Sequence, residues 1–275
     1  MSEDRQEPPH PHVWPLARHR PDSVAHIHDP IVQAVALVVL ASVFFLLFPA
    51  FDLWVSGLFY QPGYGFPMGR LPFFIDLRDL GIALAWILAL TVVAAILIKL
   101  AVPWRPGLVA ARDALFILAT LAIGPGLIVN LVFKNHWGRP RPVMLDVFSS
   151  AEPYVSVWHM SDACATNCSF VSGEASSALW LVTAAVLFPP AWRATAVKWL
   201  LVLAVALSLN RIMVGGHFIS DVVLAWGMTL IVIAFAYRLL YLDPPAGLSA
   251  ANLEAGLTRA GEAIHGLVAR ARRRT

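Results

Sequence analysis

The chain has 275 residues, of which 59% are hydrophobic and only 13% are charged. A soluble domain of this length normally carries about a quarter charged residues, so the composition excludes a single water-exposed domain and indicates extensive lipid contact. The formal net charge is only +3, and no nucleic-acid partner is expected.

Residues 1–30 are predicted to form a polar N-terminal tail. The segment holds six prolines and several acidic residues. It lacks the basic start, the short apolar stretch and the cleavage site of a secretory signal peptide.

Six apolar segments follow, and each is predicted to cross a membrane, which takes about 20 mostly apolar residues. The first two are separated by a predicted outer loop over Pro49–Asp79 that lies partly at the membrane interface. We therefore expect an all-α protein with a six-helix membrane domain over residues 31–240 and both termini on one side. The predicted spans are Ile31–Phe48, Leu80–Val102, Ala114–Phe133, Ser172–Phe188, Ala194–Met213 and Ile219–Leu240.

The basic residues predict which side the termini face. Of the 20 Lys and Arg residues, 14 fall in the N-terminal tail, in or beside the loops after the second and fourth spans, and at or after the end of the sixth span. Cytoplasmic loops carry an excess of Lys and Arg, so both termini are predicted to be cytoplasmic. The basic residues on the other side are Arg70, Arg78, Lys134, Arg139, Arg141 and Arg211.

Residues 241–275 are predicted to form a basic amphipathic tail on the cytoplasmic side. Apolar residues from Leu253 to Leu267 repeat on one helical face, and charged residues occupy the others. This pattern fits a helix lying on the anionic inner leaflet, and an ordinary solvated helix fits it equally well.

Three predicted outer segments hold nearly all the polar groups near the spans. They are Lys134–Pro142 after the third span, Cys168–Ala175 at the start of the fourth, and Asn210–Asp221 between the fifth and sixth. In the predicted topology all three lie at one depth on one side of the membrane. Chance would scatter them, so their convergence predicts a functional site.

The residue types in these segments suit a phosphoryl group. Lys134, Arg141 and Arg211 offer positive charge and several hydrogen-bond donors. Ser172 and Gly173 open a predicted helix, where free backbone N–H groups favour an anion.

His217 and Asp221 are four residues apart, a spacing that places two side chains on one face of a helix. A carboxylate there can fix the tautomer of the imidazole and stabilise its cationic form, and the imidazole can then attack phosphorus. Placing an acidic side chain in or beside an apolar span costs free energy, so Asp221 and Glu174 favour a functional interpretation. Arg139 is equally compatible with an interfacial anchor.

The first and third segments resemble signature motifs of the type 2 phosphatidic acid phosphatase family. The family motif K-x6-R-P matches Lys134 through Arg141 and the following proline. The motif S-R-x5-H-x3-D matches Arg211, His217 and Asp221, apart from its first residue. The resemblance covers roughly residues 114–240, and the predicted topology fits the integral lipid-phosphatase branch.

The resemblance implies that His217 forms a phosphohistidine, held ready by Asp221, and that water then releases the phosphate. No metal or other cofactor is expected, because cations take the role that a metal plays elsewhere. The phosphoryl oxygens would be held by Lys134, Arg141, Ser172, Gly173 and Arg211.

Two positions depart from the family pattern. Asn210 replaces a Ser that supports phosphate binding. In the second motif, P-S-G-H, Glu174 replaces the His that protonates the leaving oxygen. A carboxylic acid serves this role only if it is protonated at the working pH, and the nearby cations oppose that. We favour Glu174 as the acid, with His136 or a diphosphate leaving group that needs little protonation as alternatives.

Cys164 and Cys168 lie in the same predicted outer loop, shortly before the second motif. In an oxidising compartment they can close a small loop with a disulfide, which would place the active face in the periplasm. The segments Phe51–Tyr60 and Gly65–Phe66 resemble the lipid A phosphatase subgroup of the family.

The sequence therefore predicts a multi-pass protein of the bacterial inner membrane that removes a phosphate from a lipid, with lipid A favoured. Phosphatidylglycerophosphate or phosphatidic acid come next, and undecaprenyl diphosphate is the close alternative. The alternatives from other classes are a non-enzymatic lipid-binding protein with a degenerate site and a quinone-linked thiol oxidoreductase. The oligomeric state stays open.

Overall fold

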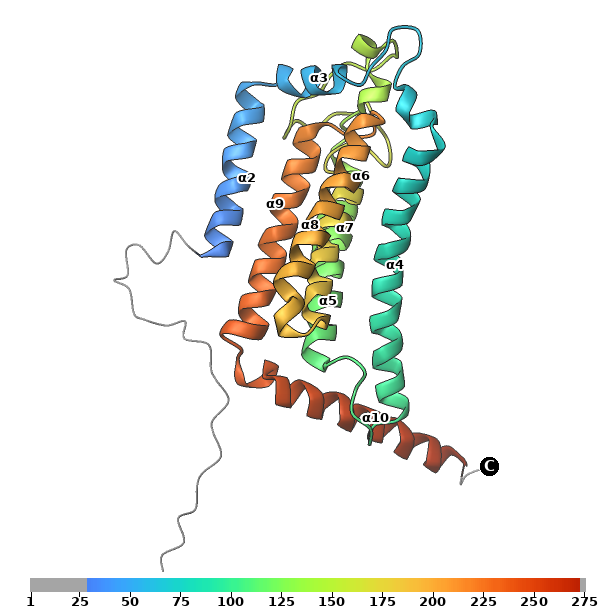
Figure 1. The fold of residues 1–275 in the computed structure, drawn as a ribbon, viewed down its shortest axis with the longest axis vertical. Coiled ribbons are helices and arrows are strands. Elements are labelled where there is room, and N and C mark those ends of the chain that lie inside the picture. The colour runs from blue at the N-terminus through green and yellow to red at the C-terminus, as the bar shows by residue number, and fades with distance from the viewer. Residues whose placement is uncertain (1–28, 273–275) are drawn as a thin grey trace, which may run out of the picture.

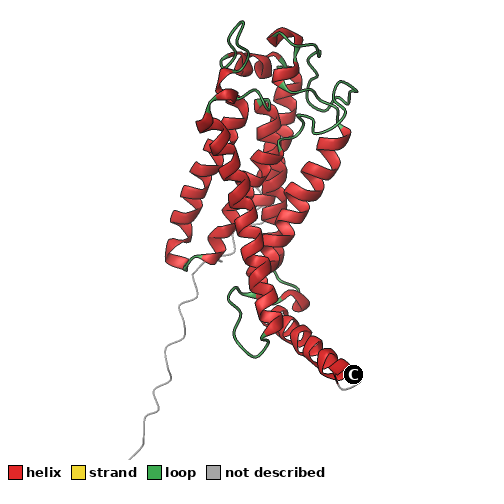
Figure 2. Cartoon of the chain, turned by 90° about the vertical axis from the view of Figure 1, so that its right-hand side faces the viewer, coloured by secondary structure: helices red, strands yellow, loops and turns green. Residues whose placement is uncertain are grey.

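The protein is seen here as a computed structural model that describes residues 29–272. This part of the chain consists of helices and loops and forms no β-strand, so the predicted all-α class is confirmed (Figures 1 and 2). The tail predicted over residues 1–30 falls almost wholly outside the described residues, as do Arg273 and Arg274 of the basic C-terminal segment.

Within the described residues, five helical segments are long and apolar enough to cross a membrane. The expected fourth span corresponds to Gly173–Leu187, which is apolar but shorter than the others. Five of the six predicted spans therefore reach full length. They are α2 (Pro30–Leu47), α4 (Pro72–Ala101), the continuous run α5 (Ala111–Leu121), η3 (Ala122–Phe133) and α6 (Lys134–His136), α8 (Pro190–Met213), and α9 (Ile219–Tyr237) with η7 (Arg238–Leu242).

The second span starts earlier than hydropathy suggests. Pro72 is the first residue of α4, where the fixed φ of proline suits the first helical turn and its missing N–H costs nothing. The outer loop predicted over Pro49–Asp79 therefore ends earlier, at Leu71. Its first part is not a loop either, because it forms the helix α3 (Ala50–Gly57). Arg78 lies on α4 and not in a loop.

The short helix α7 (Gly173–Trp180), continued by η6 (Leu181–Leu187), packs among α4, α5, α8 and α9. Trp180 is fully buried, and its indole N–H donates to the carbonyl of Ile117 at 3.0 Å. One turn earlier on α7, the hydroxyls of Ser176 and of Thr229 on α9 lie 2.7 Å apart. Polar contacts to two neighbouring spans, α5 and α9, therefore fix the helix that begins at the predicted site.

The outer end of the bundle is covered by residues 137–172 together with α3 (Figure 1). This covering is tightly packed at Gly138, which has a φ of +67°. A Cβ atom there would lie 1.5 Å from the carbonyl oxygen of Ser161, so only glycine fits.

The opposite end carries α10 (Ala250–Arg272), which packs across the bases of α4 and α5 (Figure 1). The buried Lys99 of α4 donates to two loop carbonyls and lies 3.4 Å from a carboxylate oxygen of Glu254 on α10. Because α2 also begins toward this end, both described ends of the chain lie toward the same end of the bundle (Figure 1). The predicted amphipathic helix is present, and its position on a membrane surface stays a prediction.

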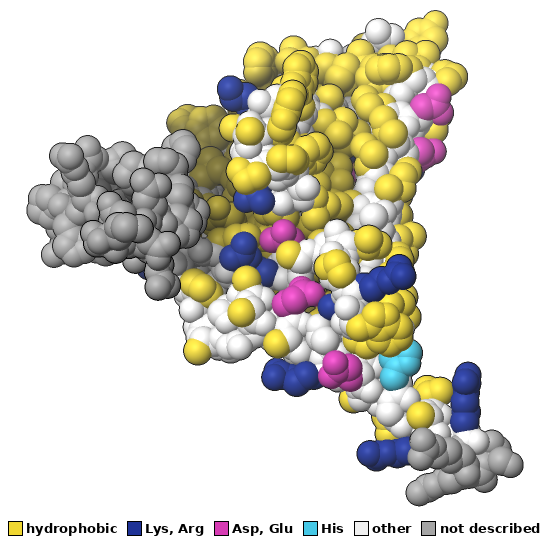
Figure 3. All heavy atoms as spheres, turned by 60° about the horizontal axis from the view of Figure 1, so that its bottom comes forward, with side chains coloured by type: hydrophobic (Ala, Val, Ile, Leu, Met, Phe, Trp, Pro, Cys, Tyr) yellow, Lys and Arg dark blue, Asp and Glu magenta, His cyan; other side chains and the backbone are white. Residues whose placement is uncertain are grey.

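The flanks of the bundle carry exposed apolar side chains, among them Leu40, Trp86 and Leu97. Figure 3 shows hydrophobic side chains spreading over the flanks and Lys and Arg side chains gathered toward the α10 end. An apolar belt with charges at its ends is what a bilayer environment requires.

Candidate active site

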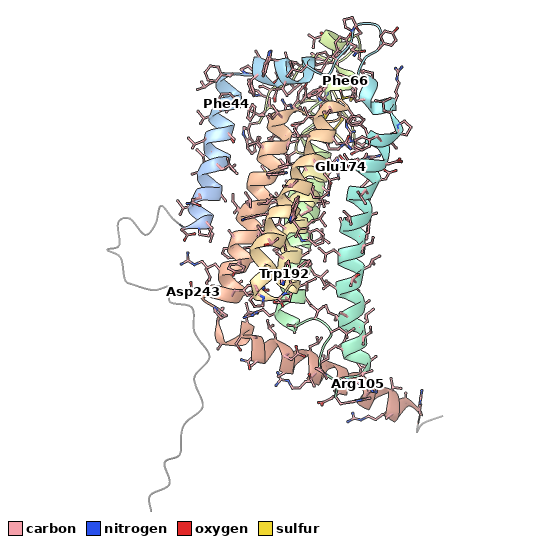
Figure 4. The ribbon with its side chains drawn as sticks, in the orientation of Figure 1. Phe44, Phe66, Arg105, Glu174, Trp192 and Asp243 are labelled. Carbon is pink, nitrogen blue, oxygen red and sulfur yellow. A yellow bond between two sulfur atoms is a disulfide. The ribbon has the colours of Figure 1, made fainter. Side chains whose placement is uncertain are left out.

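The structure brings the three predicted polar segments together at the outer end of the bundle. Lys134 follows directly on η3, Ser172 is the N-cap of α7, and His217 lies in the turn that joins α8 to α9. Glu174, labelled in Figure 4, lies near this outer end between the central helices and α4. Segments far apart in the sequence thus form one site.

His217 is fully buried, and its ring is oriented by a backbone carbonyl. Its Nδ1 atom lies 2.8 Å from the carbonyl oxygen of Ser169 and 3.7 Å from Oδ2 of Asp221. Because a carbonyl only accepts hydrogen bonds, Nδ1 carries a proton, and in the neutral ring Nε2 is the nitrogen with the free electron pair. Among the described residues, Nε2 has no hydrogen-bond partner.

The prediction that His217 and Asp221 share a helix face is wrong. The helix α9 begins at Ile219, so His217 precedes it. The turn before the helix brings the two side chains together, and Asp221 stabilises this turn. Its Oδ2 accepts the N–H of Phe218 at 2.9 Å and the hydroxyl of Ser169 at 2.5 Å.

Arg139 is fully buried and lies between two carboxylates, so it is not an interfacial anchor. Its Nη1 donates to Oδ1 of Asp221 at 2.5 Å, and its Nη2 donates to Oδ2 of Asp52 at 2.7 Å. Burial alone would lower the pKa of Arg139, but the carboxylates of Asp221 and Asp52 outweigh it and raise that pKa above its usual value. The guanidinium stays charged and ties α3 to α9.

Asp52 is a residue that the sequence reasoning missed. It lies on α3 and is fully buried, and its oxygens also accept the N–H of Ser220 at 3.0 Å and the Ser220 hydroxyl at 2.6 Å. The hydroxyl of Tyr154 donates to it at 3.2 Å. The available signal was an acid within an apolar segment, which is rarely buried without a partner.

Glu174 lies between two guanidinium groups. Its Oε2 accepts from Nε of Arg211 and its Oε1 from Nε of Arg78, both at 2.9 Å. The same Oε2 lies 3.3 Å from Nε2 of His217, but the two atoms are not aligned for a hydrogen bond. Arg78 was not predicted as a site residue, because hydropathy placed it in the outer loop.

A cavity of about 410 Å³ extends from this cluster along the bundle. Its polar end is lined by Lys134, Glu174 and Arg211, and its remainder by apolar residues of α4, α5 and η3 such as Ile82 and Trp86. A cavity with one cationic end and an apolar body is suited to an amphiphile with an anionic headgroup.

A second cavity of about 290 Å³ lies beside the first and is lined by Arg78, Arg141 and Arg211. Arg141 is held by the carbonyl of Asn167, to which its Nη2 and Nε donate at 2.8 and 3.2 Å. Asn167 belongs to the loop that the disulfide between Cys164 and Cys168 closes. The disulfide thus constrains the backbone that positions a predicted phosphate-binding residue.

Replacing Cys164 and Cys168 together by serine is expected to raise KM by up to about tenfold, with a smaller effect on kcat. The opened loop would hold Arg141 less firmly, and a hydrogen bond to a charged group contributes about 1.5–3 kcal/mol at most. Steady-state kinetics with and without reductant measure this effect, and the double variant should be insensitive to reductant. An unchanged KM in the double variant would show that the loop does not position Arg141.

Ser172 and Asn210, which the sequence placed in the motifs, line neither cavity and instead make contacts that stabilise the fold. The Ser172 hydroxyl oxygen caps α7 by accepting the N–H of Ala175 at 3.2 Å. The side-chain amide of Asn210 donates to the carbonyl of Phe74 at 2.8 Å and so ties α8 to α4. His136 is exposed and bonds the carbonyl of Val132 on its own helix, so the structure does not bring it to the cavities.

Gly173 permits a close approach between α7 and the preceding span. A Cβ atom at this position would lie 2.7 Å from Oδ1 of Asn130 and 3.4 Å from Nζ of Lys134. Asn130 is itself held through a hydrogen bond to the carbonyl of Pro125 at 2.7 Å, so it cannot easily move away. Glycine therefore lets the start of α7 lie against Asn130, one turn before Lys134.

Gly173→Ala is expected to lower kcat/KM by about 100-fold, because a displacement of about 1 Å at a positioned group costs this much. Thermal unfolding should change far less than activity. Gly57→Ala is the matched control, since no atom lies within 4 Å of a Cβ at Gly57. If Gly173→Ala kept full activity, the close approach of Lys134 would have no role in the site.

Comparison with known proteins agrees with this geometry. The family model of the PAP2 superfamily matches residues 113–243. A lipid A 4'-phosphatase of Francisella tularensis subsp. novicida is 35% identical over 224 residues, which cover 77% of this chain and 96% of that relative. The chain belongs to the PAP2 superfamily. The family resemblance predicted from the three motifs is thereby confirmed.

Other PAP2 relatives match a shorter stretch. Lipid A 4'-phosphatases of Rhizobium leguminosarum and Rhizobium etli are 43% and 42% identical over 117 residues, or 42% of this chain. The chain spans 50% and 46% of the length of these two relatives. No solved structure matches the chain significantly.

Proposed function

We propose that this PAP2 protein is a membrane phosphatase that removes a phosphate from a lipid headgroup through a phosphohistidine at His217. One observation carries the proposal. Nε2 of the fully buried His217 lies 3.3 Å from the carboxylate of Glu174, and Glu174 and Arg211 line the cationic end of a cavity of about 410 Å³ whose body is apolar.

In the proposed reaction the cations hold the phosphoryl oxygens, and Gly173 offers its N–H at the start of α7. Nε2 of His217 attacks phosphorus, the bond from phosphorus to the lipid oxygen breaks, and this oxygen takes a proton from water and leaves as an alcohol. The ring then carries a positive charge, which the Ser169 carbonyl at 2.8 Å and the Asp221 carboxylate at 3.7 Å stabilise. Water attacks the phosphohistidine, releases phosphate and restores the free imidazole. The phosphate-binding cations are Lys134, Arg141 and Arg211.

We propose lipid A as the favoured substrate. The Francisella and Rhizobium relatives are named lipid A 4'-phosphatases. The apolar body of the larger cavity also favours a substrate whose phosphorylated headgroup enters from the membrane while acyl chains remain among the helices.

We propose a location in the bacterial inner membrane with the site on the periplasmic side and both termini in the cytoplasm. The excess of basic residues in the segments at the α10 end supports this orientation through the positive-inside rule. The disulfide between Cys164 and Cys168 at the site end supports it independently, because disulfides persist in oxidising compartments.

A lipid diphosphate is the second candidate substrate, favoured by the contacts of Glu174. A carboxylate between two guanidinium groups at 2.9 Å is ionised and has no proton to donate to a leaving oxygen. A phosphate leaving from a diphosphate needs little protonation. Undecaprenyl diphosphate therefore remains the alternative to a monoester, and a non-enzymatic lipid-binding protein remains the alternative of another class.

One assay separates these candidates. The protein, purified in detergent with a chelator present, would be given lipid A, phosphatidylglycerophosphate or undecaprenyl diphosphate, and released phosphate would be measured. Release from lipid A is expected. Faster release from the diphosphate would assign the second candidate, and absence of release from every lipid would contradict an enzymatic function.

A further inference from the structure

The phosphoryl position of this site is occupied by one of the protein's own side chains. Oε2 of Glu174 lies 3.3 Å from Nε2 of His217 and 2.9 Å from Nε of Arg211. A phosphorus atom that Nε2 attacks must itself come within about 3–3.5 Å of that nitrogen. The carboxylate and a reactive phosphoryl group therefore cannot occupy this position together.

The same carboxylate separates His217 from the cavities. His217 is fully buried and lines neither cavity, whereas Glu174 lines the larger one and its side chain is 21% exposed. An ionised carboxylate on guanidinium groups also forms the charge-assisted hydrogen bonds that a phosphoryl oxygen would form. Glu174 is thus an internal substitute for the anion that the site binds.

The two arginines that bind the carboxylate of Glu174 differ in solvent exposure. Both arginines line the two cavities, but Arg211 is only 8% exposed and lies beside His217, whereas Arg78 comes from α4 and is 46% exposed. The larger cavity borders Glu174, Arg78 and Ser177, so it offers space on the Arg78 side. The carboxylate can leave Arg211 by rotation about its own side-chain bonds while it keeps its contact with Arg78.

We propose that Glu174 occupies the phosphoryl site of the unliganded protein, that phosphate displaces it from Arg211, and that Arg78 holds the displaced carboxylate. Arg78 is then a positioning residue that acts through Glu174, and it does not bind phosphate itself. The inference rests on the proposed function, because it assumes that a phosphoryl group binds beside His217.

The test is a double-mutant cycle read by phosphate binding and not by turnover. Inorganic phosphate would be titrated by calorimetry into the full chain in detergent, as wild type, Glu174→Gln, Arg78→Ala and the double variant. Glu174→Gln should bind phosphate about tenfold more tightly, because the internal competitor is gone. Arg78→Ala should weaken binding about tenfold when Glu174 is present and have little effect in the Glu174→Gln background, since coupled residues are not additive.

Two controls exclude simpler explanations. Arg70→Ala removes the same charge from an exposed position that lines neither cavity, so it measures the general electrostatic effect. Arg78→Lys keeps a positive charge for the carboxylate and should restore part of the affinity. Thermal unfolding of each variant shows that the fold is retained.

Other outcomes overturn the inference. An equal loss from Arg78→Ala in both backgrounds would show that Arg78 binds phosphate directly. Unchanged or weaker binding by Glu174→Gln would show that the carboxylate does not compete. These results would leave the proposed function intact, whereas a wild type that binds no phosphate would contradict that function as well.

Discussion

His217→Ala is expected to lower phosphate release from the lipid substrate by about a thousandfold or more, because it removes the nucleophile. His217→Gln should lose as much, since an amide cannot form the phosphorylated intermediate. Initial rates of phosphate release by the purified variants measure this effect.

The control for this prediction is His159→Ala. His159 is an exposed histidine of the outer loop whose Nδ1 lies 2.8 Å from the Ser156 hydroxyl, and its replacement should leave the rate unchanged. His136→Ala addresses the alternative proton donor, which the structure leaves outside both cavities. Substantial activity in the two His217 variants would remove this residue from the chemistry.

Arg139→Met is expected to reduce the free energy of unfolding by about 3–5 kcal/mol, because it leaves two buried carboxylates without their shared partner. Those carboxylates belong to Asp52 and Asp221, both fully buried. Asp221 also holds the turn that carries His217. Activity should therefore fall together with stability.

Unfolding by a denaturing detergent, followed by circular dichroism, measures this loss of stability. Asp52→Asn should cost less, because the single amide oxygen still accepts one of the two hydrogen bonds that Ser220 donates. Arg70→Ala, at an exposed position on the same side, should change stability by no more than about 0.5 kcal/mol. If Arg139→Met unfolded like the wild type, the buried ion pairs would not stabilise the site.

The spans were largely predictable from sequence because hydropathy reports lipid contact directly. The start of α4 was not predictable in this way, because charged residues around Arg78 interrupt the apolar pattern. The helix nevertheless begins earlier, at Pro72. Most residues of the short α7 are buried through packing against neighbouring helices and not because of the length of the helix. Hydropathy does not contain that information.

The site was predictable to the extent that its residues lie in three short segments with specific spacing. The network around Arg139 was not, because Asp52 is 87 residues away in the sequence and no local pattern pairs the two. The i, i+4 spacing of His217 and Asp221 suggested a helix, whereas the first helical residue is Ile219. In that case spacing predicted proximity correctly and local structure wrongly.

The stereochemistry at phosphorus tests the central proposal most directly. The substrate would be a lipid with a thiophosphoryl group labelled with one oxygen isotope, hydrolysed in water that carries another, and the configuration of the released thiophosphate would be determined. A phosphohistidine requires two successive in-line displacements, one by His217 and one by water, and therefore predicts retention of configuration. Inversion would show that water attacks the lipid phosphate directly and would contradict a covalent role for His217.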